Sequence, residues 1–131
     1  MDNSITQSRQ QLILVTGAAR SGKSEWAEAL AIQTDKAVIY IATATIDPTD
    51  LEWQARILRH QQRRPATWQT VAAVQSLAST IDSARSSECL LIDSLGTWVA
   101  NLLDRSDAEW ENLTQELLGV LPTSLATIIV V

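Results

Sequence analysis

The sequence predicts an α/β fold, with a mostly parallel β-sheet and helices on both of its faces. Four short apolar runs have the continuous hydrophobic pattern of strands that are buried on both sides. Segments with helical spacing separate these runs, and strands that alternate with helices form βαβ units whose strands are parallel. The four runs lie at residues 12–16, 38–43, 90–93 and 127–131.

Helices are expected between the runs, and local signals place their ends. Pro48 and Asp50 mark the start of one helix, and Pro65 favours its end near Arg63. Two later segments repeat apolar side chains every three or four positions, as amphipathic helices do. The expected helices span residues 23–33, 50–63, 74–84 and 107–119, and a short additional strand is expected at 67–71.

The length and composition of the chain fit one globular domain. It has 131 residues, of which 46% are hydrophobic and 19% charged, which is ordinary for a folded protein. Residues 1–11 are polar and are expected to be disordered or frayed. Because the sequence stops within the last predicted strand, we expect that the C-terminal part of the domain is missing.

Charge and cysteine usage narrow the classes of function and partner. The net charge of −5 argues against nucleic acid and anionic membranes as partners, since both require a basic surface. No run approaches the roughly 20 apolar residues of a membrane span. One cysteine, Cys89, excludes a disulfide framework and a Cys-based zinc site, and its apolar neighbours predict that it is buried. A cytoplasmic location is expected.

The strongest motif is Gly-x4-Gly-Lys-Ser, which lies between the first predicted strand and the first predicted helix. In such a loop the backbone N–H groups surround anionic oxygens, and the helix amino end adds roughly half a positive charge. Lys23 is expected to reach the β- and γ-phosphates of a nucleoside triphosphate, and the Ser24 hydroxyl to bind Mg²⁺. Residues 12–131 are therefore expected to form a P-loop nucleotide-binding domain. Its predicted phosphate-binding residues are Gly17, Ala18, Ala19, Arg20, Ser21, Gly22, Lys23 and Ser24.

An aspartate at the end of the third apolar run is a candidate Mg²⁺ ligand. Asp93 directly follows Leu90-Leu91-Ile92. In P-loop proteins a carboxylate at this place holds Mg²⁺ directly or through water. An apolar run that ends in Asp is common in α/β folds, so the alternative is an aspartate that caps the following turn. Given the P-loop, Ser24 and Asp93 are the expected metal-binding pair.

The only histidine, His60, lies in the predicted helix 50–63 among arginines. Arginine forks bind two phosphate oxygens at once, so Arg56 and Arg59 are candidate nucleotide-binding residues. A histidine held among such arginines could attack phosphorus in its neutral form, which nearby cations favour. Spacing alone leaves open the alternative of a solvated basic helix face. At 3.6 residues per turn that face, about 100° wide, carries Glu52, Arg56, Arg59, His60 and Arg63.

Several stretches, in this order and spacing, resemble one family. The most particular are Tyr40-Ile41-Ala42-Thr43-Ala44, Arg56-Ile57 with His60, and Asn101-Leu102-Leu103. The P-loop segment 13–24, residues 50–57, Arg64-Pro65, Trp68-Gln69-Thr70 and residues 91–103 extend the match. Together they resemble the bifunctional adenosylcobinamide kinase / adenosylcobinamide-phosphate guanylyltransferase family of cobalamin biosynthesis.

The resemblance implies two activities. One phosphorylates the aminopropanol hydroxyl of adenosylcobinamide with ATP or GTP, and the other transfers GMP from GTP to adenosylcobinamide phosphate. The transfer passes through a GMP–histidine intermediate, and the matching position here is His60. The resemblance also implies Mg²⁺ as cofactor and a homo-oligomer. One departure is Ala18, where the family usually has glycine; an alanine is tolerated there if its φ stays negative.

Two other interpretations remain at this level. The first is a P-loop small-molecule kinase without guanylyl transfer, in which His60 has no chemical role. The second is an inactive, truncated fragment that binds nucleotide weakly or assembles with a partner. A regulatory GTPase is less favoured, because the sequence lacks an Asn-Lys-x-Asp motif for reading guanine.

Overall fold

The computed structural model describes residues 11–44 and 49–131, and for Trp53, Arg56, Ile57 and His60 it describes the backbone only. Residues 1–10 of the segment expected to be frayed lie outside this range, as does Pro48. The elements in chain order are β1 (Leu12–Leu14), α2 (Lys23–Gln33), β2 (Ala37–Ala42), α3 (Leu51–Arg63), β3 (Gln69–Ala72), α4 (Leu77–Asp82), β4 (Glu88–Asp93), α5 (Leu95–Ala100), α6 (Asp107–Val120) and β5 (Thr127–Val130).

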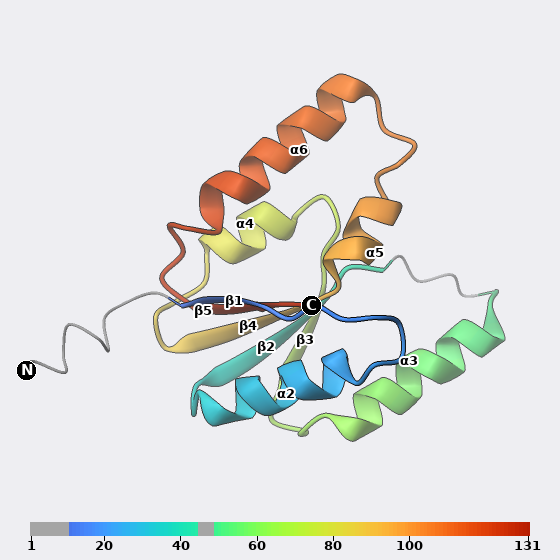
Figure 1. Cartoon of the computed structure of the whole chain (residues 1–131), viewed down its shortest axis with the longest axis vertical. Coiled ribbons are helices and arrows are strands. Elements are labelled where there is room, and N and C mark those ends of the chain that lie inside the picture. Colours follow the sequence, from blue (N-terminus) through green and yellow to red (C-terminus); the bar gives the residue numbers. More distant parts are fainter. Residues whose placement is uncertain (1–10, 45–48) are drawn as a thin grey trace, which may run out of the picture.

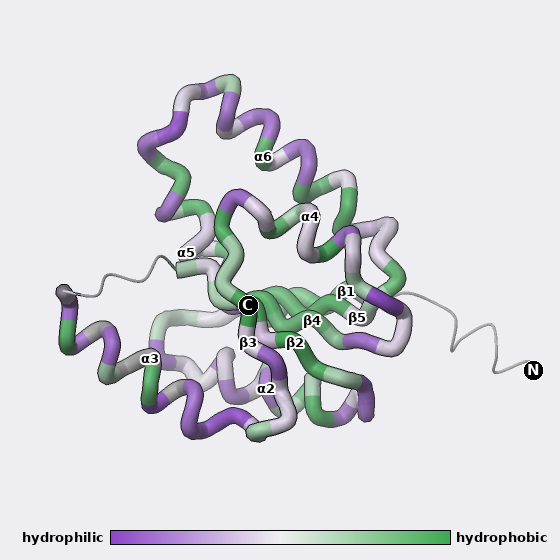
Figure 2. Tube along the Cα trace, turned by 180° about the vertical axis from the view of Figure 1, so that it is seen from behind, coloured by the Kyte–Doolittle hydropathy of each residue, from purple (hydrophilic) through white to green (hydrophobic). Residues whose placement is uncertain are grey.

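The described strands form one sheet of five parallel strands in the order β1-β5-β4-β2-β3. Helices α2 and α3 lie on one face of this sheet, and α4, α5 and α6 lie on the other (Figure 1). The predicted α/β class, with a parallel sheet and helices on both faces, is confirmed. The hydropathy-coloured trace shows the strands as the most hydrophobic part of the molecule (Figure 2).

Each face of the sheet packs against its helices through a separate apolar cluster. Toward α2 the cluster includes Val38, Tyr40 and Leu91 with Ala27 and Ala31 of the helix. Cys89 belongs to it and is fully buried, as its apolar neighbours predicted. Toward α4, α5 and α6 the cluster is larger. Its buried members include Leu77, Ile81, Leu90, Ile92, Trp98, Leu102, Leu117, Ile128 and Val130.

The register of the central strands places their carboxyl ends together. Strands β2 and β4 pair over six residues, from Ala37 opposite Glu88 to Ala42 opposite Asp93. Strand β5 continues the sheet with Val130 opposite Ile92. In parallel sheets ligands bind beyond the carboxyl ends of the strands. Asp93 ends β4 at that edge, next to the loop that follows β1.

The prediction that residues 12–16 form a strand buried on both faces is wrong for part of β1. Leu12 is 49% and Leu14 62% exposed, because β1 is an edge strand that pairs only with β5 among the described strands. Both leucines line a groove of about 330 Å³ between the sheet and α6. A continuous apolar run therefore predicted the strand correctly but not its burial.

Two helical segments differ from their predicted limits. The helix expected at 74–84 is shorter than predicted and corresponds to α4. The chain just before α4 is held by another interaction, because the Trp98 indole donates a hydrogen bond to the Val74 carbonyl at 2.8 Å. Residues 95–103 had no predicted structure and contain α5, whose first turn is capped by the Ser94 hydroxyl accepting from the Thr97 N–H at 3.1 Å. Within the described residues, no helix is long and apolar enough to cross a membrane.

Candidate functional site

The loop between β1 and α2 has the backbone conformation of an anion-binding turn. Gly22 has φ of +85° and Arg20 of +60°, so the chain turns through left-handed conformations before the helix starts. A Cβ on Gly17 would lie 2.7 Å from the Ser21 hydroxyl, so a larger residue at that position would require the Ser21 side chain to move. Ala18 is not among the described residues with positive φ, which fits an alanine at that position.

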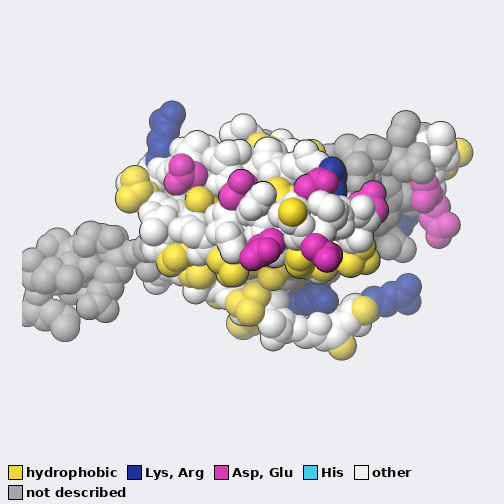
Figure 3. All heavy atoms as spheres, turned by 90° about the horizontal axis from the view of Figure 1, so that it is seen from above, with side chains coloured by type: hydrophobic (Ala, Val, Ile, Leu, Met, Phe, Trp, Pro, Cys, Tyr) yellow, Lys and Arg dark blue, Asp and Glu magenta, His cyan; other side chains and the backbone are white. Residues whose placement is uncertain are grey.

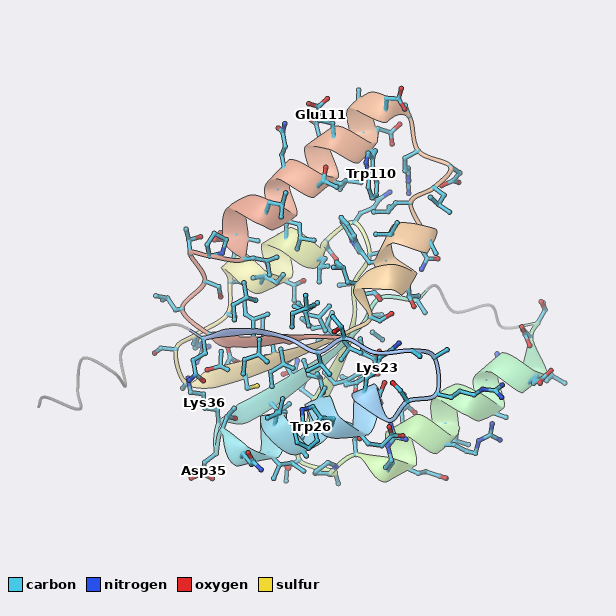
Figure 4. All side chains as sticks on the ribbon, in the orientation of Figure 1. Lys23, Trp26, Asp35, Lys36, Trp110 and Glu111 are labelled. Carbon is cyan, nitrogen blue, oxygen red and sulfur yellow. The ribbon has the colours of Figure 1, made fainter. Side chains whose placement is uncertain are left out.

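The first residues of α2 carry the two side chains that the motif assigns to a nucleotide. Lys23 stands at the amino end of the helix, beside the carboxyl ends of the strands (Figure 4). Its ammonium donates to the Gly17 carbonyl at 3.1 Å, so it folds back over the loop. The helix amino end directs its N–H groups and positive dipole into the same space.

Ser24 and Asp93 are brought together, as predicted. The Ser24 hydroxyl donates to Oδ2 of Asp93 at 3.4 Å, across 69 residues of sequence. Two oxygen ligands at neighbouring corners of a Mg²⁺ octahedron lie about 2.9 Å apart, since each is about 2.0–2.1 Å from the metal. A hydroxyl and a carboxylate at this separation fit Mg²⁺ bound jointly with the phosphates of a nucleotide. The residues therefore fit the metal that the motif implies.

Tyr40, for which no role was predicted, holds the same carboxylate. Its hydroxyl donates to Oδ2 of Asp93 at 2.7 Å, and its side chain is 6% exposed. Burial raises the pKa of Tyr40 well above its usual value, and the adjacent negative charge of Asp93 raises it further. The phenol therefore stays protonated and remains a hydrogen-bond donor at neutral pH.

Helix α3 brings an arginine to the P-loop. A cavity of about 590 Å³ lies in front of the loop and has Arg59 of α3 on its wall. Arg56 and His60 belong to the same helix, but their side chains lie outside the described residues. The structure thus joins Arg59 to the phosphate-binding loop and gives Arg56 and His60 a backbone position only. The other residues lining the cavity are Arg20, Ser21, Gly22, Lys23, Ser24 and Glu25.

Two arginines anchor the carboxyl end of α3. Arg63 binds the buried Glu28 of α2 with two hydrogen bonds, of 3.0 and 2.8 Å, and Glu25 with a third of 2.9 Å. Arg64 is 8% exposed, and its guanidinium carbon lies 3.6 Å from the centre of the Tyr40 ring. Both contacts fix α3 beside the P-loop helix and the end of the sheet.

Sequence reasoning missed three of these residues as parts of the site: Tyr40, Glu28 and Arg64. Tyr40 carried one usable signal, because a tyrosine inside an apolar strand needs a partner for its hydroxyl when it is buried. The partner could not be named without the pairing of β2 with β4. Arg64 belonged to a stretch of the family resemblance but had no predicted role, and the partner of Glu28, Arg63, lies 35 positions away, which no local pattern shows.

Comparison with known proteins shows the family of this chain. A family model described as cobinamide kinase / cobinamide phosphate guanyltransferase matches residues 13–131. The chain is 47% identical over 115 residues to the bifunctional adenosylcobalamin biosynthesis protein CobP of Pseudomonas aeruginosa, an alignment that covers 83% of this chain and 65% of that protein. It is 43% identical over 111 residues to the bifunctional adenosylcobalamin biosynthesis protein CobU of Escherichia coli, covering 80% and 60%.

The corresponding protein of Salmonella typhimurium is 39% identical over 111 residues, with the same coverage of 80% and 60%. The matched region thus amounts to 60–65% of the length of these relatives. The resemblance seen in the sequence is confirmed by the family match, which spans the P-loop, α3 and all strands from β2 onward. This chain belongs to the cobinamide kinase / cobinamide phosphate guanyltransferase family.

Proposed function

We propose that this protein is a nucleotide-dependent transferase with two activities in cobalamin biosynthesis. It phosphorylates adenosylcobinamide with ATP or GTP, and it transfers GMP from GTP to adenosylcobinamide phosphate. The observation that carries the proposal is the convergence of the P-loop and Arg59 of α3 on one cavity, where Ser24 on the cavity wall donates a hydrogen bond to Asp93. The names of its relatives supply the substrate class.

The kinase step requires the P-loop to hold a triphosphate with its γ-phosphorus open to attack. The aminopropanol hydroxyl oxygen forms the new bond to this phosphorus, and the bond to the β,γ-bridging oxygen breaks. Lys23 and the loop N–H groups bind the phosphate oxygens and stabilise the negative charge on the leaving diphosphate. Ser24 and Asp93 would hold Mg²⁺, which when bound would neutralise further charge at the phosphates.

Guanylyl transfer proceeds as two displacements at the α-phosphorus of GTP. A ring nitrogen of His60 first displaces pyrophosphate and forms a phosphorus–nitrogen bond to GMP. A phosphate oxygen of adenosylcobinamide phosphate then attacks the same phosphorus, and the bond to His60 breaks, which restores the free imidazole. Arg59, one residue before His60, lines the cavity beside the P-loop and is placed to bind phosphate oxygens.

The family resemblance further suggests that the protein works as a homo-oligomer in the cytoplasm. Light scattering of the purified protein across a concentration series tests the oligomer: a mass that is a constant multiple of 14.4 kDa supports it. A monomer mass at every concentration would contradict it.

GTP labelled at either the α- or the γ-phosphate separates the two proposed activities. With adenosylcobinamide as acceptor and Mg²⁺ present, γ-label is expected in a phosphorylated corrinoid, and α-label in a GDP-linked product. Transfer of γ-label alone would reduce the function to a small-molecule kinase. Absence of both products, with GTP still raising the melting temperature, would leave a nucleotide-binding protein without transfer activity.

A further inference from the structure

Tyr40 lies between Asp93 and the end of α3, two parts of the site that no sequence motif connects. It lies on β2 opposite Leu91 of β4, and Asp93 is two residues further along β4 on the same face of the sheet. An aromatic side chain reaches such a diagonal neighbour. The hydroxyl consequently meets Oδ2 of Asp93 at 2.7 Å.

The contact with Asp93 orients the carboxylate. Of the side-chain hydrogen bonds that the structure describes to Asp93, both the short one from Tyr40 and the longer one from Ser24 end on Oδ2. If the Ser24 hydroxyl binds a metal instead, its hydrogen bond to Asp93 is lost, and the hydrogen bond from Tyr40 to Oδ2 is kept. Ordered donors behind a metal-binding carboxylate fix its direction, and removing them typically costs about 10- to 100-fold in metal affinity or activity.

The opposite side of Tyr40 contacts the end of α3. The Arg64 guanidinium lies over the ring, and the Arg64 N–H donates to the Gln61 carbonyl within the last turn of the helix at 3.2 Å. Arg63, the preceding residue, ties the helix to Glu28 and Glu25 of α2. The ring of Tyr40 is thus packed against Arg64, the residue that directly follows the helix carrying Arg59 and position 60, while its hydroxyl holds Asp93.

We propose that Tyr40 is a positioning residue that sets the Asp93 carboxylate for Mg²⁺ and couples its place to the docked end of α3. This inference rests on the proposed function, because it concerns the metal used with the nucleotide. Tyr40 itself touches neither nucleotide nor metal. It acts through Asp93 by a hydrogen bond and through Arg64 by a ring contact.

The first test uses the unmodified protein. Tyr40 is the only tyrosine in the sequence, so labelling with ¹³Cζ-tyrosine gives a single resonance. Mn²⁺ replaces Mg²⁺ as a paramagnetic probe. Addition of Mn²⁺ with GTP is expected to broaden this resonance strongly, whereas Mg²⁺ with GTP is expected to shift it without broadening. A resonance that neither broadens nor shifts, while Mn²⁺ and GTP are bound, would overturn the proposal.

The second test removes only the hydroxyl. In Tyr40→Phe the affinity for Mn²⁺ in the presence of GTP, measured by electron paramagnetic resonance, is expected to fall about 10-fold or more. The affinity for GTP without metal is expected to change by less than about 3-fold, a split that a general loss of structure would not produce. Equal losses of both affinities, or no loss of either, would contradict a positioning role.

A matched control removes another buried hydroxyl far from the carboxylate. Thr127 is buried at the amino end of β5 and accepts from the Lys36 ammonium at 2.9 Å. Thr127→Val is expected to leave the Mn²⁺ affinity unchanged. If the wild-type protein binds no Mn²⁺ with GTP, both this inference and the proposed function are rejected. If it binds Mn²⁺ normally but the Tyr40 resonance does not change, this inference alone is rejected.

Discussion

The two faces of the sheet each pack through an apolar cluster, but they differ in the polar interactions that accompany it. On the α2–α3 face, charged and polar side chains connect the elements: Arg63 binds Glu28 and Glu25, and Tyr40 binds Asp93. On the opposite face, α4, α5 and α6 pack through an apolar cluster, and the groove below α6 is lined by leucines and tryptophans. Seen from the α6 side, the outer surface carries acidic and hydrophobic side chains interspersed (Figure 3).

This difference suggests that the α4–α6 face contributes mainly to stability and the α2–α3 face mainly to the geometry of the site. Apolar burial is proportional to area and is not directional, so the apolar cluster of the α4–α6 face contributes mainly to the free energy of folding. Hydrogen-bonded charges have fixed directions, and the P-loop, Asp93 and α3 are positioned by them. Substitutions on the two faces should therefore affect different measurements.

The largest effect on stability is expected at the centre of the apolar face. Leu90 is fully buried, and Leu90→Ala should lower the free energy of unfolding by about 2–5 kcal/mol through lost contacts and a cavity. Urea unfolding measures this change. Leu125, which is 70% exposed, is the control, and Leu125→Ala should stay within about 0.5 kcal/mol of wild type. Similar losses in both variants would remove the distinction between buried and exposed leucines.

The next effect concerns the polar face and should appear in activity. Lys23→Ala removes the ammonium assigned to the phosphates and is expected to reduce transfer from GTP by about 10²- to 10³-fold. Its one described hydrogen bond, to the Gly17 carbonyl, is exposed, so the melting temperature should hardly change. Lys36, at the other end of α2 (Figure 4), provides the control. Lys36→Ala should keep full transfer, and an equal loss there would point to general charge rather than to the loop.

A smaller effect on the free energy of unfolding is expected at the two glutamates that bind Arg63. Glu28 is buried and binds Arg63 twice, whereas the Glu25 side chain is 56% exposed. Allowing for the partial exposure of Arg63, Glu28→Ala should cost about 1–2 kcal/mol of unfolding free energy and Glu25→Ala about 0–1 kcal/mol. Chemical denaturation of both variants measures the difference. If Glu25→Ala were the more damaging variant, the assigned anchor of α3 would be wrong.

The smallest effect is a pH dependence from Cys89. Burial raises the pKa of its thiol, although a hydrogen bond from Thr34 and the charge of Lys36 act in the opposite direction. A raised folded-state pKa gives stability that is complete below the unfolded pKa and is lost as pH rises toward the folded value. Unfolding free energy should therefore fall less steeply between about pH 8 and pH 10 in Cys89→Ala than in wild type. Identical slopes would show that Cys89 does not contribute.

Sequence reasoning predicted the strands and the loop but not how the parts meet. Local patterns predicted strands β2, β4 and β5 and the P-loop before α2. Buried strands give continuous apolar runs, and the loop requires glycines at fixed positions. The burial of β1 was not readable, since an apolar run does not show whether a strand lies at an edge. The Ser24–Asp93 pair was predicted from the motif, whereas the Tyr40–Asp93 and Arg64–Tyr40 contacts depend on the pairing of β2 with β4 and on the docking of α3.

The central claim is that the P-loop and α3 form one GTP site whose nucleophile is His60. Its most direct test is to incubate the protein with Mg²⁺ and α-labelled GTP and to locate bound GMP by peptide mass spectrometry. We predict an acid-labile GMP adduct on the peptide that contains His60, lost in His60→Ala and Lys23→Ala but kept in Gln62→Ala. A GMP adduct on another residue, or one that persists in His60→Ala, would contradict the account.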